Sequence, residues 1–260
     1  MKLKTIAGLV AAAAVMVGQA EAAQVRIYGD APWGLSLANM DTFYDGVTGG
    51  NSQIIASLDS SSIAGGGLLW LTQPNSAYSS SQLTALQGFL AGGGRIAFMG
   101  EHGQIAPSQN NNINAALTYL GASIQIQNLA PDGGFRSASV LDGQIKAHTL
   151  TAGVSTYEYA CFAPLIVSGT AQVLMTGEDD PTQVMMAYQN IGSGSIFLIT
   201  DQNVWDSEPS NWGNFDNEKM FENLLLADTG APPVNGVPEP STALLAGLGL
   251  IGLSSLRRRK

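Results

Sequence analysis

Cysteine and charge are both scarce in this chain of 260 residues. The single cysteine, Cys161, cannot form an internal disulfide, which excludes a disulfide-stapled scaffold. Only 12% of the residues are charged whereas 45% are hydrophobic, which excludes a disordered acidic chain. The length and the 31 glycines instead indicate a compact domain with a sizeable core and many tight turns.

Basic residues are especially rare in the body of the chain. Two lysines lie within the first five positions and residues 257–260 are RRRK, which leaves five basic residues against eighteen acidic ones between Ala23 and Pro238. The formal charge of that stretch is therefore −13. Because such a body repels nucleic acid and anionic lipid, we expect no nucleic-acid partner.

Long hydrophobic runs are missing, and the two short ones lie near the ends of the chain. At the start, two lysines precede an apolar run over residues 6–17, and the triplet AEA at residues 20–22 fits the small-residue pattern of a cleavage site. The run is too short to span a membrane comfortably. We therefore predict a signal peptide over residues 1–22, cleaved after Ala22 or Ala23.

The second apolar run follows a stretch typical of a linker, residues 230–237, whose prolines and glycines resist helix and strand. A helix over residues 241–256 would rise about 24 Å at ~1.5 Å per residue. The apolar core of a bilayer is about 30 Å thick. The tail, residues 238–260, is thus predicted to hold a short, marginal transmembrane helix. Its RRRK end is expected to stay cytoplasmic, which places the acidic body outside.

The tail sequence, VPEPSTALLAGLGLIGLSSLRRRK, also resembles the PEP-CTERM sorting signal of Gram-negative bacteria. The resemblance rests on Pro238, Glu239 and Pro240, the apolar stretch and the terminal arginines. It implies transient insertion in the inner membrane, cleavage near the triplet by an exosortase, and release to a cell surface or medium rich in exopolysaccharide. A plain single-pass anchor is the alternative.

Strand-like and helix-like segments alternate over residues 23–229, which we expect to form one domain. Strands are predicted at residues 24–30, 68–71, 95–100, 122–128, 171–177, 182–188 and 194–200, and helices within 37–43, 79–94, 110–121 and 217–226. The last two strands are joined by a hairpin-like turn, QNIGSG. The pattern predicts an α/β fold with a mainly parallel sheet flanked by helices and a β-hairpin extension.

Several of these segments resemble the class I glutamine amidotransferase-like superfamily, which is flavodoxin-like in architecture. They are LLWLTQP, LTALQGFLAGGGRIAFMGEHG, HTLTAGV, GSGSIFLITDQNVW and DNEKMFENLLL, within residues 24–226. In the amidotransferases a cysteine nucleophile sits on a tight strand-to-helix turn. The corresponding turn here, residues 100–103, reads GEHG and holds neither Cys nor Ser, and Cys161 lies elsewhere in an apolar run, where we expect a buried residue. Amidotransferase chemistry is therefore not supported.

Polar residues do follow the predicted parallel strands. They are Gln73, Glu101, His102, Asp201 and Asn203. Ligands of α/β proteins bind outside the carboxyl ends of such strands, so these five residues form the candidate binding site. Glu101 and His102 are also suited to capping the next helix or to hydrogen-bonding across the cleft, which is the favoured alternative. Glu, His and Asp also suit an ion site or acid–base catalysis.

The acidic stretch that begins at Asp201 suggests no metal site. Counted from that residue, Trp205 and Asp206 stand at the fifth and sixth positions, where an EF-hand needs an oxygen ligand and a glycine. Neither a metal nor a cofactor is predicted. The tryptophans Trp205 and Trp212 are expected to pack over the sheet edge, or alternatively to stack on sugar rings.

Two functions fit these features. The first is an exported, non-enzymatic binding or structural module at the cell surface or in the extracellular matrix, with exopolysaccharide as a candidate partner. The second is a hydrolase of glycans or amides that uses Glu101, His102 and Asp201. The hydrolase requires these three side chains to converge on one accessible point.

Overall fold

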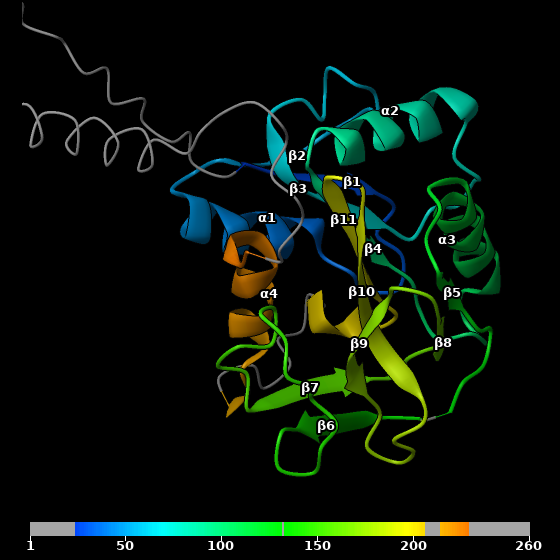
Figure 1. The fold of residues 1–260 in the computed structure, drawn as a ribbon, viewed down its shortest axis with the longest axis vertical. Coiled ribbons are helices and arrows are strands. Elements are labelled where there is room, and N and C mark those ends of the chain that lie inside the picture. Colours follow the sequence, from blue (N-terminus) through cyan, green and yellow to red (C-terminus); the bar gives the residue numbers. More distant parts are fainter. Residues whose placement is uncertain (1–23, 132, 206–213, 229–260) are drawn as a thin grey trace, which may run out of the picture. The chain divides into compact units, whose positions relative to one another are not determined.

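The computed structural model describes residues 24–131, 133–205 and 214–228 (Figure 1). The predicted signal peptide, linker and sorting tail lie outside these residues, as does Trp212. In the part of the chain that is described, no helix combines the length and the apolar character needed to cross a membrane.

A nine-stranded sheet forms the centre of the described part of the chain, in the order β2-β1-β3-β4-β11-β10-β8-β5, with β9 also paired to β10. The first five strands run parallel: β2 (Ser52–Ile54), β1 (Gln24–Gly29), β3 (Gly66–Thr72), β4 (Arg95–Met99) and β11 (Gly194–Ile199). The rest pair antiparallel: β10 (Val184–Ile191), β8 (Leu165–Val167), β5 (Ile124–Ile126) and β9 (Gln172–Thr176). The predicted fold class is confirmed, although the antiparallel extension is larger than one hairpin.

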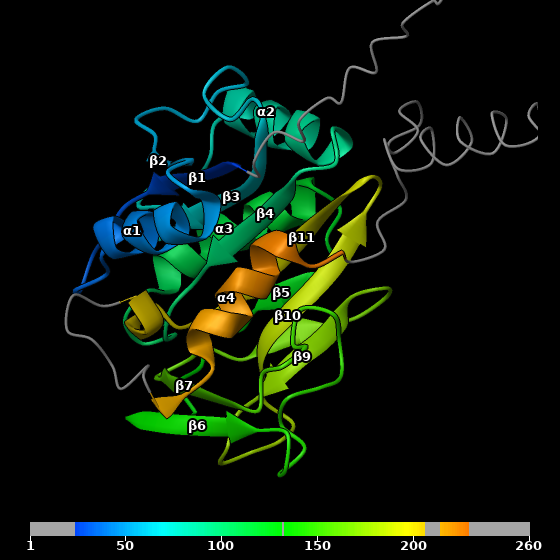
Figure 2. The ribbon, with the colours of Figure 1, turned by 90° about the vertical axis from the view of Figure 1, so that its left-hand side faces the viewer.

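Helices cover both faces of the sheet (Figures 1 and 2). One face packs against α1 (Leu37–Thr48) and α4 (Asn217–Leu226), and the other against α2 (Ser80–Ala91) and α3 (Pro107–Tyr119). Successive side chains of a strand point to opposite faces, so within β3 Trp70 joins the first core and Leu71 the second. Burial on both faces explains why these strands are continuous apolar runs rather than alternating ones.

Local signals in the sequence set the ends of the helices. Ser79 and Gln82 form a capping box at the start of α2, as the serine run predicted. The helix α1 is longer than expected because Ser36 caps its start and Gly49, at a φ of 68°, ends it. Helix α3 begins at Pro107, earlier than predicted, because proline suits the first turn.

The predicted hairpin joins β10 and β11. Ile191 pairs with Gly194, so Gly192 and Ser193 form a two-residue turn. Gly192 has a φ of 59°, a conformation that glycine adopts without strain.

A separate two-stranded sheet, β6 (Phe135–Ser139) and β7 (Thr156–Ala160), was not predicted. Figure 1 shows it below the main sheet. The backbone N–H of Ala160 donates to Asp201, just after β11, at 2.7 Å, and the N–H of Glu158 donates to Asn217 at 2.9 Å. This small sheet therefore covers part of the carboxyl end of the main one.

Arg95, at the start of β4, holds the end of the last described helix. Its guanidinium donates to the carbonyl oxygens of Leu224 and, at 3.1 Å, of Ala227, and it lies 5.8 Å from the ring centre of Tyr188. Carbonyl groups at a helix end have no partner within the helix, so a cation there satisfies them. The contact ties α4 to the sheet just before the chain enters the predicted linker.

We predict that Arg95→Met lowers the free energy of unfolding by about 2 kcal/mol or more, because the carbonyl groups of Leu224 and Ala227 at the end of α4 lose their donor. The matched variant Arg136→Met removes an exposed ion pair with Asp179 and should cost less than about 1 kcal/mol. Urea unfolding of both variants measures the difference. Equal losses would contradict the role given to Arg95.

Candidate functional site

The predicted site residues follow β3, β4 and β11, which are consecutive neighbours in the sheet. The structure therefore places Gln73, Glu101 and Asp201 along one edge, as the sequence predicted. All three are buried, however, with exposed fractions of 2% or less. Their contacts decide what they are able to do.

Glu101 connects two turns of the backbone. Its Oε1 accepts from the N–H of His102 at 2.7 Å, and its Oε2 accepts from the N–H of Gln202, after β11, at 3.0 Å. The Glu101 backbone is paired in both directions with the side chain of Asn110 in α3. The carboxylate thus fastens the turn after β4 to the turn after β11.

Asp201 plays a similar part at the next strand. Its Oδ2 accepts from the N–H of Ala160 in β7, and its Oδ1 accepts from the N–H of Asn203 at 2.8 Å. Burial, reinforced by the nearby Asp201 carboxylate, holds the pKa of Tyr157 well above its usual value. Asp201 therefore joins the small sheet to the main one.

The turn after β4, residues 100–103, is covered by another segment of the chain. His102 is 7% exposed. The N–H of Gly103 donates to the carbonyl of Leu129 at 3.0 Å, and a Cβ at Gly103 would lie 2.3 Å from the carbonyl carbon of Asn128. Only glycine fits at position 103 beneath residues 128–129, and these residues cover the carboxyl end of β4.

Gln73 stands out among the predicted residues. It has a φ of 26°, which is uncommon for a residue other than glycine. Within the described part of the chain, neither polar atom of its buried amide has a hydrogen-bond partner. It follows β3 and leads into Pro74 and Asn75, which line the pocket described next.

The carboxyl ends of the parallel strands are open to solvent between β1 and β3. The chain leaves β1 through α1 to reach β2 on one side, and then returns to form β3 on the other side of β1. The helices that follow β1 and β3 thus pack on opposite faces. Crevices of α/β sheets form at such a switch in strand order.

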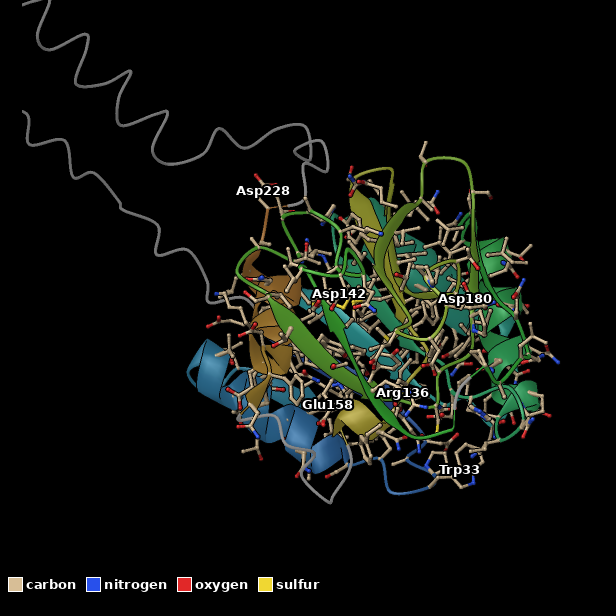
Figure 3. All side chains as sticks on the ribbon, turned by 90° about the horizontal axis from the view of Figure 1, so that it is seen from below. Trp33, Arg136, Asp142, Glu158, Asp180 and Asp228 are labelled. Carbon is tan, nitrogen blue, oxygen red and sulfur yellow. The ribbon has the colours of Figure 1, made fainter. Side chains whose placement is uncertain are left out.

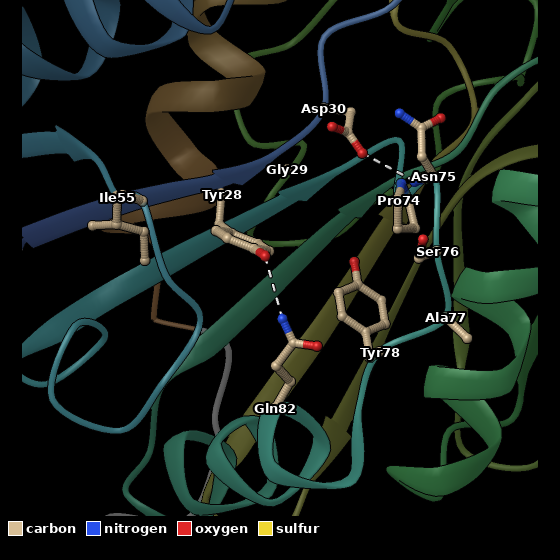
Figure 4. Close-up of a pocket in the computed structure, with 11 residues that line it drawn as sticks. Tyr28, Gly29, Asp30, Ile55, Pro74, Asn75, Ser76, Ala77, Tyr78 and Gln82 are labelled. Carbon is tan, nitrogen blue, oxygen red and sulfur yellow. Dashed lines mark hydrogen bonds between the residues drawn. The ribbon is translucent and has the colours of Figure 1, made fainter.

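A pocket of about 530 Å³ occupies this position (Figure 4). The volume is typical of small-ligand sites. Its wall combines aromatic, amide, hydroxyl and carboxylate side chains with a few small apolar ones: Tyr28, Gly29, Asp30, Ile55, Ala56, Pro74, Asn75, Ser76, Ala77, Tyr78 and Gln82.

Hydrogen bonds hold the polar wall of the pocket in place (Figure 4). The carboxylate of Asp30 accepts from the N–H of Asn75 at 3.0 Å, and its carbonyl accepts from the hydroxyl of Thr72 at 2.8 Å. The amide of Gln82 donates to the hydroxyl of Tyr28 at 3.2 Å. Burial raises the pKa of Tyr78, and the nearby Tyr28 and Asp30 add to the effect, so its phenol stays protonated.

The sequence reasoning did not select Tyr28, Asp30 or Tyr78. The strand QVRIYGD was recognised, and its Gly-Asp ending was a usable signal. Tyr78 precedes the capping serine of α2 and carried no signal of its own. The residues meet only because β1 and β3, which are separated in the chain, pair in the sheet.

Trp205 is 2% exposed and lies 4.6 Å from Phe221, ring centre to ring centre. It therefore packs in the core rather than over the sheet edge, and it is not a platform for sugars. Cys161 follows β7 and is half-buried, rather than buried in an apolar strand.

Glu158, on β7, was not considered a site residue. Figure 3 shows it near the β6–β7 sheet that also carries Arg136. It is 8% exposed, and its Oε2 makes no hydrogen bond with the described residues. It borders a shallow depression beside Asp201 and Asn203. Even so, no three His, Cys, Asp or Glu side chains within the described residues are grouped to hold a metal ion.

Solved structures share this fold at low sequence identity. The N-terminal domain of mmIFT52 has a TM-score of 0.62 at 16% identity, with 79% of this chain and 99% of that chain covered. The cytoplasmic protein STM1381 of Salmonella typhimurium LT2 has a TM-score of 0.57 at 12% identity, with coverage of 78% and 98%. A ThuA-like protein from Bacteroides uniformis has a TM-score of 0.52 at 10% identity, with coverage of 82% and 96%. These likenesses show a shared α/β fold alone and nothing about activity.

The PEP-CTERM protein-sorting motif matches residues 236–260. No curated protein matches the chain. The motif supports C-terminal sorting of an exported protein and implies processing by an exosortase. The match covers the predicted tail only. The role of the folded domain has to be argued from the geometry of that domain.

We predict that Gly29→Ala lowers the free energy of unfolding by about 3 kcal/mol. Gly29 has a φ of 135°, and a Cβ there would lie 2.1 Å from the carbonyl oxygen of Thr72. The control Gly46→Ala, within α1 and with no atom within 4 Å of the new Cβ, should raise stability by about 0.5–1 kcal/mol. Denaturant unfolding measures both, and a neutral Gly29→Ala would show that β1 and β3 do not approach this closely.

Proposed function

We propose that this protein is exported and serves as a non-enzymatic binding or structural module at the cell surface or in the extracellular matrix. The observation that carries the proposal is the sorting motif at residues 236–260, on a chain that also begins with a predicted signal peptide, residues 1–22. The expected surroundings are rich in exopolysaccharide, which makes exopolysaccharide the proposed partner.

The proposed route follows from the order of the segments. The signal peptide directs the chain through the inner membrane and is removed near Ala22. The tail, residues 238–260, holds the protein in the membrane until an exosortase cleaves near Pro238, Glu239 and Pro240. The linker at residues 230–237 separates that cleavage point from the folded domain.

Binding is favoured over catalysis because the polar side chains that follow β4 and β11 are buried and already hydrogen-bonded. A general acid or base must reach the proton that it transfers. The carboxylates of Glu101 and Asp201 instead accept hydrogen bonds from backbone N–H groups, and both residues are buried. His102 is buried on the same covered turn. These contacts support structural roles and weigh against a hydrolase built on the three residues.

We predict that the exported protein begins at Ala23 or Gln24 and lacks residues 257–260. Intact-mass analysis of the protein recovered from exosortase-containing cells measures both ends. The control is a variant with alanine at Pro238, Glu239 and Pro240, which should keep the full tail. A complete C-terminus on the unaltered exported protein would contradict the processing step.

We predict that Glu101→Gln lowers the free energy of unfolding by about 1–3 kcal/mol, because an amide NH₂ faces a backbone N–H that has lost its acceptor. The matched change Glu222→Gln alters only an exposed pair with Lys219 and should cost less than about 1 kcal/mol. Neither variant should change a hydrolysis rate on glycan or amide substrates. A measured turnover that Glu101→Gln abolishes, in protein that remains folded, would overturn the non-enzymatic function.

A further inference from the structure

The pocket between β1 and β3 has a lining unsuited to anionic ligands. Its described lining residues include one carboxylate, Asp30, and no Lys, Arg or His. The start of α2 offers little to an anion, because the N–H of Gln82 bonds to the hydroxyl of Ser79 and the N–H of Ser79 to the side chain of Gln82. With the acidic body around it, the pocket repels phosphates and uronates.

The same lining suits a ligand that carries many hydroxyl groups. Tyr28 and Tyr78 each present a phenol, which donates and accepts, and their hydroxyl ends lie toward one another across the pocket in Figure 4. Asp30 is exposed, and its Oδ1 accepts no hydrogen bond from the described residues, so it is open to a ligand hydroxyl. Asn75 and Ser76 add further polar groups.

Apolar surface is also present beside these polar groups. The tyrosine rings, Ile55 and Pro74 provide flat or small hydrophobic contacts. An aromatic ring with a polar tip suits a ligand whose C–H face is apolar and whose edge is covered with hydroxyls. Sugar rings have that character, whereas lipids and aromatic heterocycles lack the hydroxyl edge.

The pocket is organised before any ligand binds. The backbone and carboxylate of Asp30 are fixed by Thr72 and Asn75, and Tyr28 is fixed by Gln82. The ring of Tyr78 packs edge-on against Phe98, with ring centres 6.5 Å apart. Little conformational entropy is therefore lost on binding, which favours affinity for a small polar ligand.

From this arrangement we propose that the pocket at the carboxyl ends of β1 and β3 binds an uncharged saccharide. Asp30 accepts hydrogen bonds from sugar hydroxyls, the phenols of Tyr28 and Tyr78 donate and accept, and a tyrosine ring packs on the sugar's apolar face. This inference rests on the proposed function as an exported binding module. The inference restricts the proposed exopolysaccharide partner to neutral rather than acidic polysaccharides.

The test is a calorimetric titration of the exported protein with cellobiose, maltose, lactose and mannobiose, with digalacturonate as the charged comparison. At least one neutral disaccharide should bind, and digalacturonate should not. Asp30→Asn should weaken binding roughly tenfold to a hundredfold, since it removes a charged acceptor. Tyr78→Phe should weaken it roughly threefold to tenfold.

Two matched variants serve as controls on the same protein. Asp142→Asn and Tyr119→Phe change exposed residues away from the pocket lining and should leave affinity within about twofold. The inference is overturned if no neutral disaccharide binds, if digalacturonate binds more tightly, or if Asp30→Asn and Tyr78→Phe match their controls. If the exported protein is processed as predicted and shows no hydrolysis, any of these results would leave the proposed function intact. Only the proposal that the pocket binds a neutral saccharide would be rejected.

Discussion

The position of β1 between β2 and β3 is the constraint on which the site depends. Because the chain leaves β1 in one direction and later returns on its other side, α1 and α2 must cover opposite faces of the sheet. Neither helix then covers the carboxyl ends of β1 and β3, and a pocket remains there. Gly29 pairs with Thr72 at the ends of these two strands, and its lack of a side chain permits the close approach beneath the pocket.

At the carboxyl ends of the neighbouring strands β4 and β11, buried carboxylates hold the turns together. Glu101 fastens the turns after β4 and β11, and Asp201 fastens the second of these turns to β7. Gln202 extends the connection, since its amide donates to the carbonyls of Pro32 and Trp33 in the loop that follows Asp30. Residues that resemble a catalytic group in the sequence thereby hold together the turns that follow β1, β4 and β11.

Much of the fold was predictable because its central strands and helices are long, apolar and clearly bounded. The strands β2 and β8 were missed because each has three residues and no alternating flanks, whereas the equally short β5 lies within the alternating segment ASIQIQN. The strand β6 was missed because it contains mostly polar or small residues. The polar residues after β3, β4 and β11 were also recognisable in the sequence, because each follows a clear apolar strand. The pocket was not, because the sequence does not state that β1 lies beside β3, or that residues 128 and 129 cover the turn after β4.

The central claim is that the ligand site lies at the carboxyl ends of β1 and β3 rather than at those of β4 and β11. Backbone amide shifts in NMR spectra, recorded as a neutral disaccharide is added to the exported protein, test it most directly. We expect the largest shifts at Tyr28, Asp30 and residues 75–82. Shifts centred instead on residues 101–103 and 201–203 would contradict the claim.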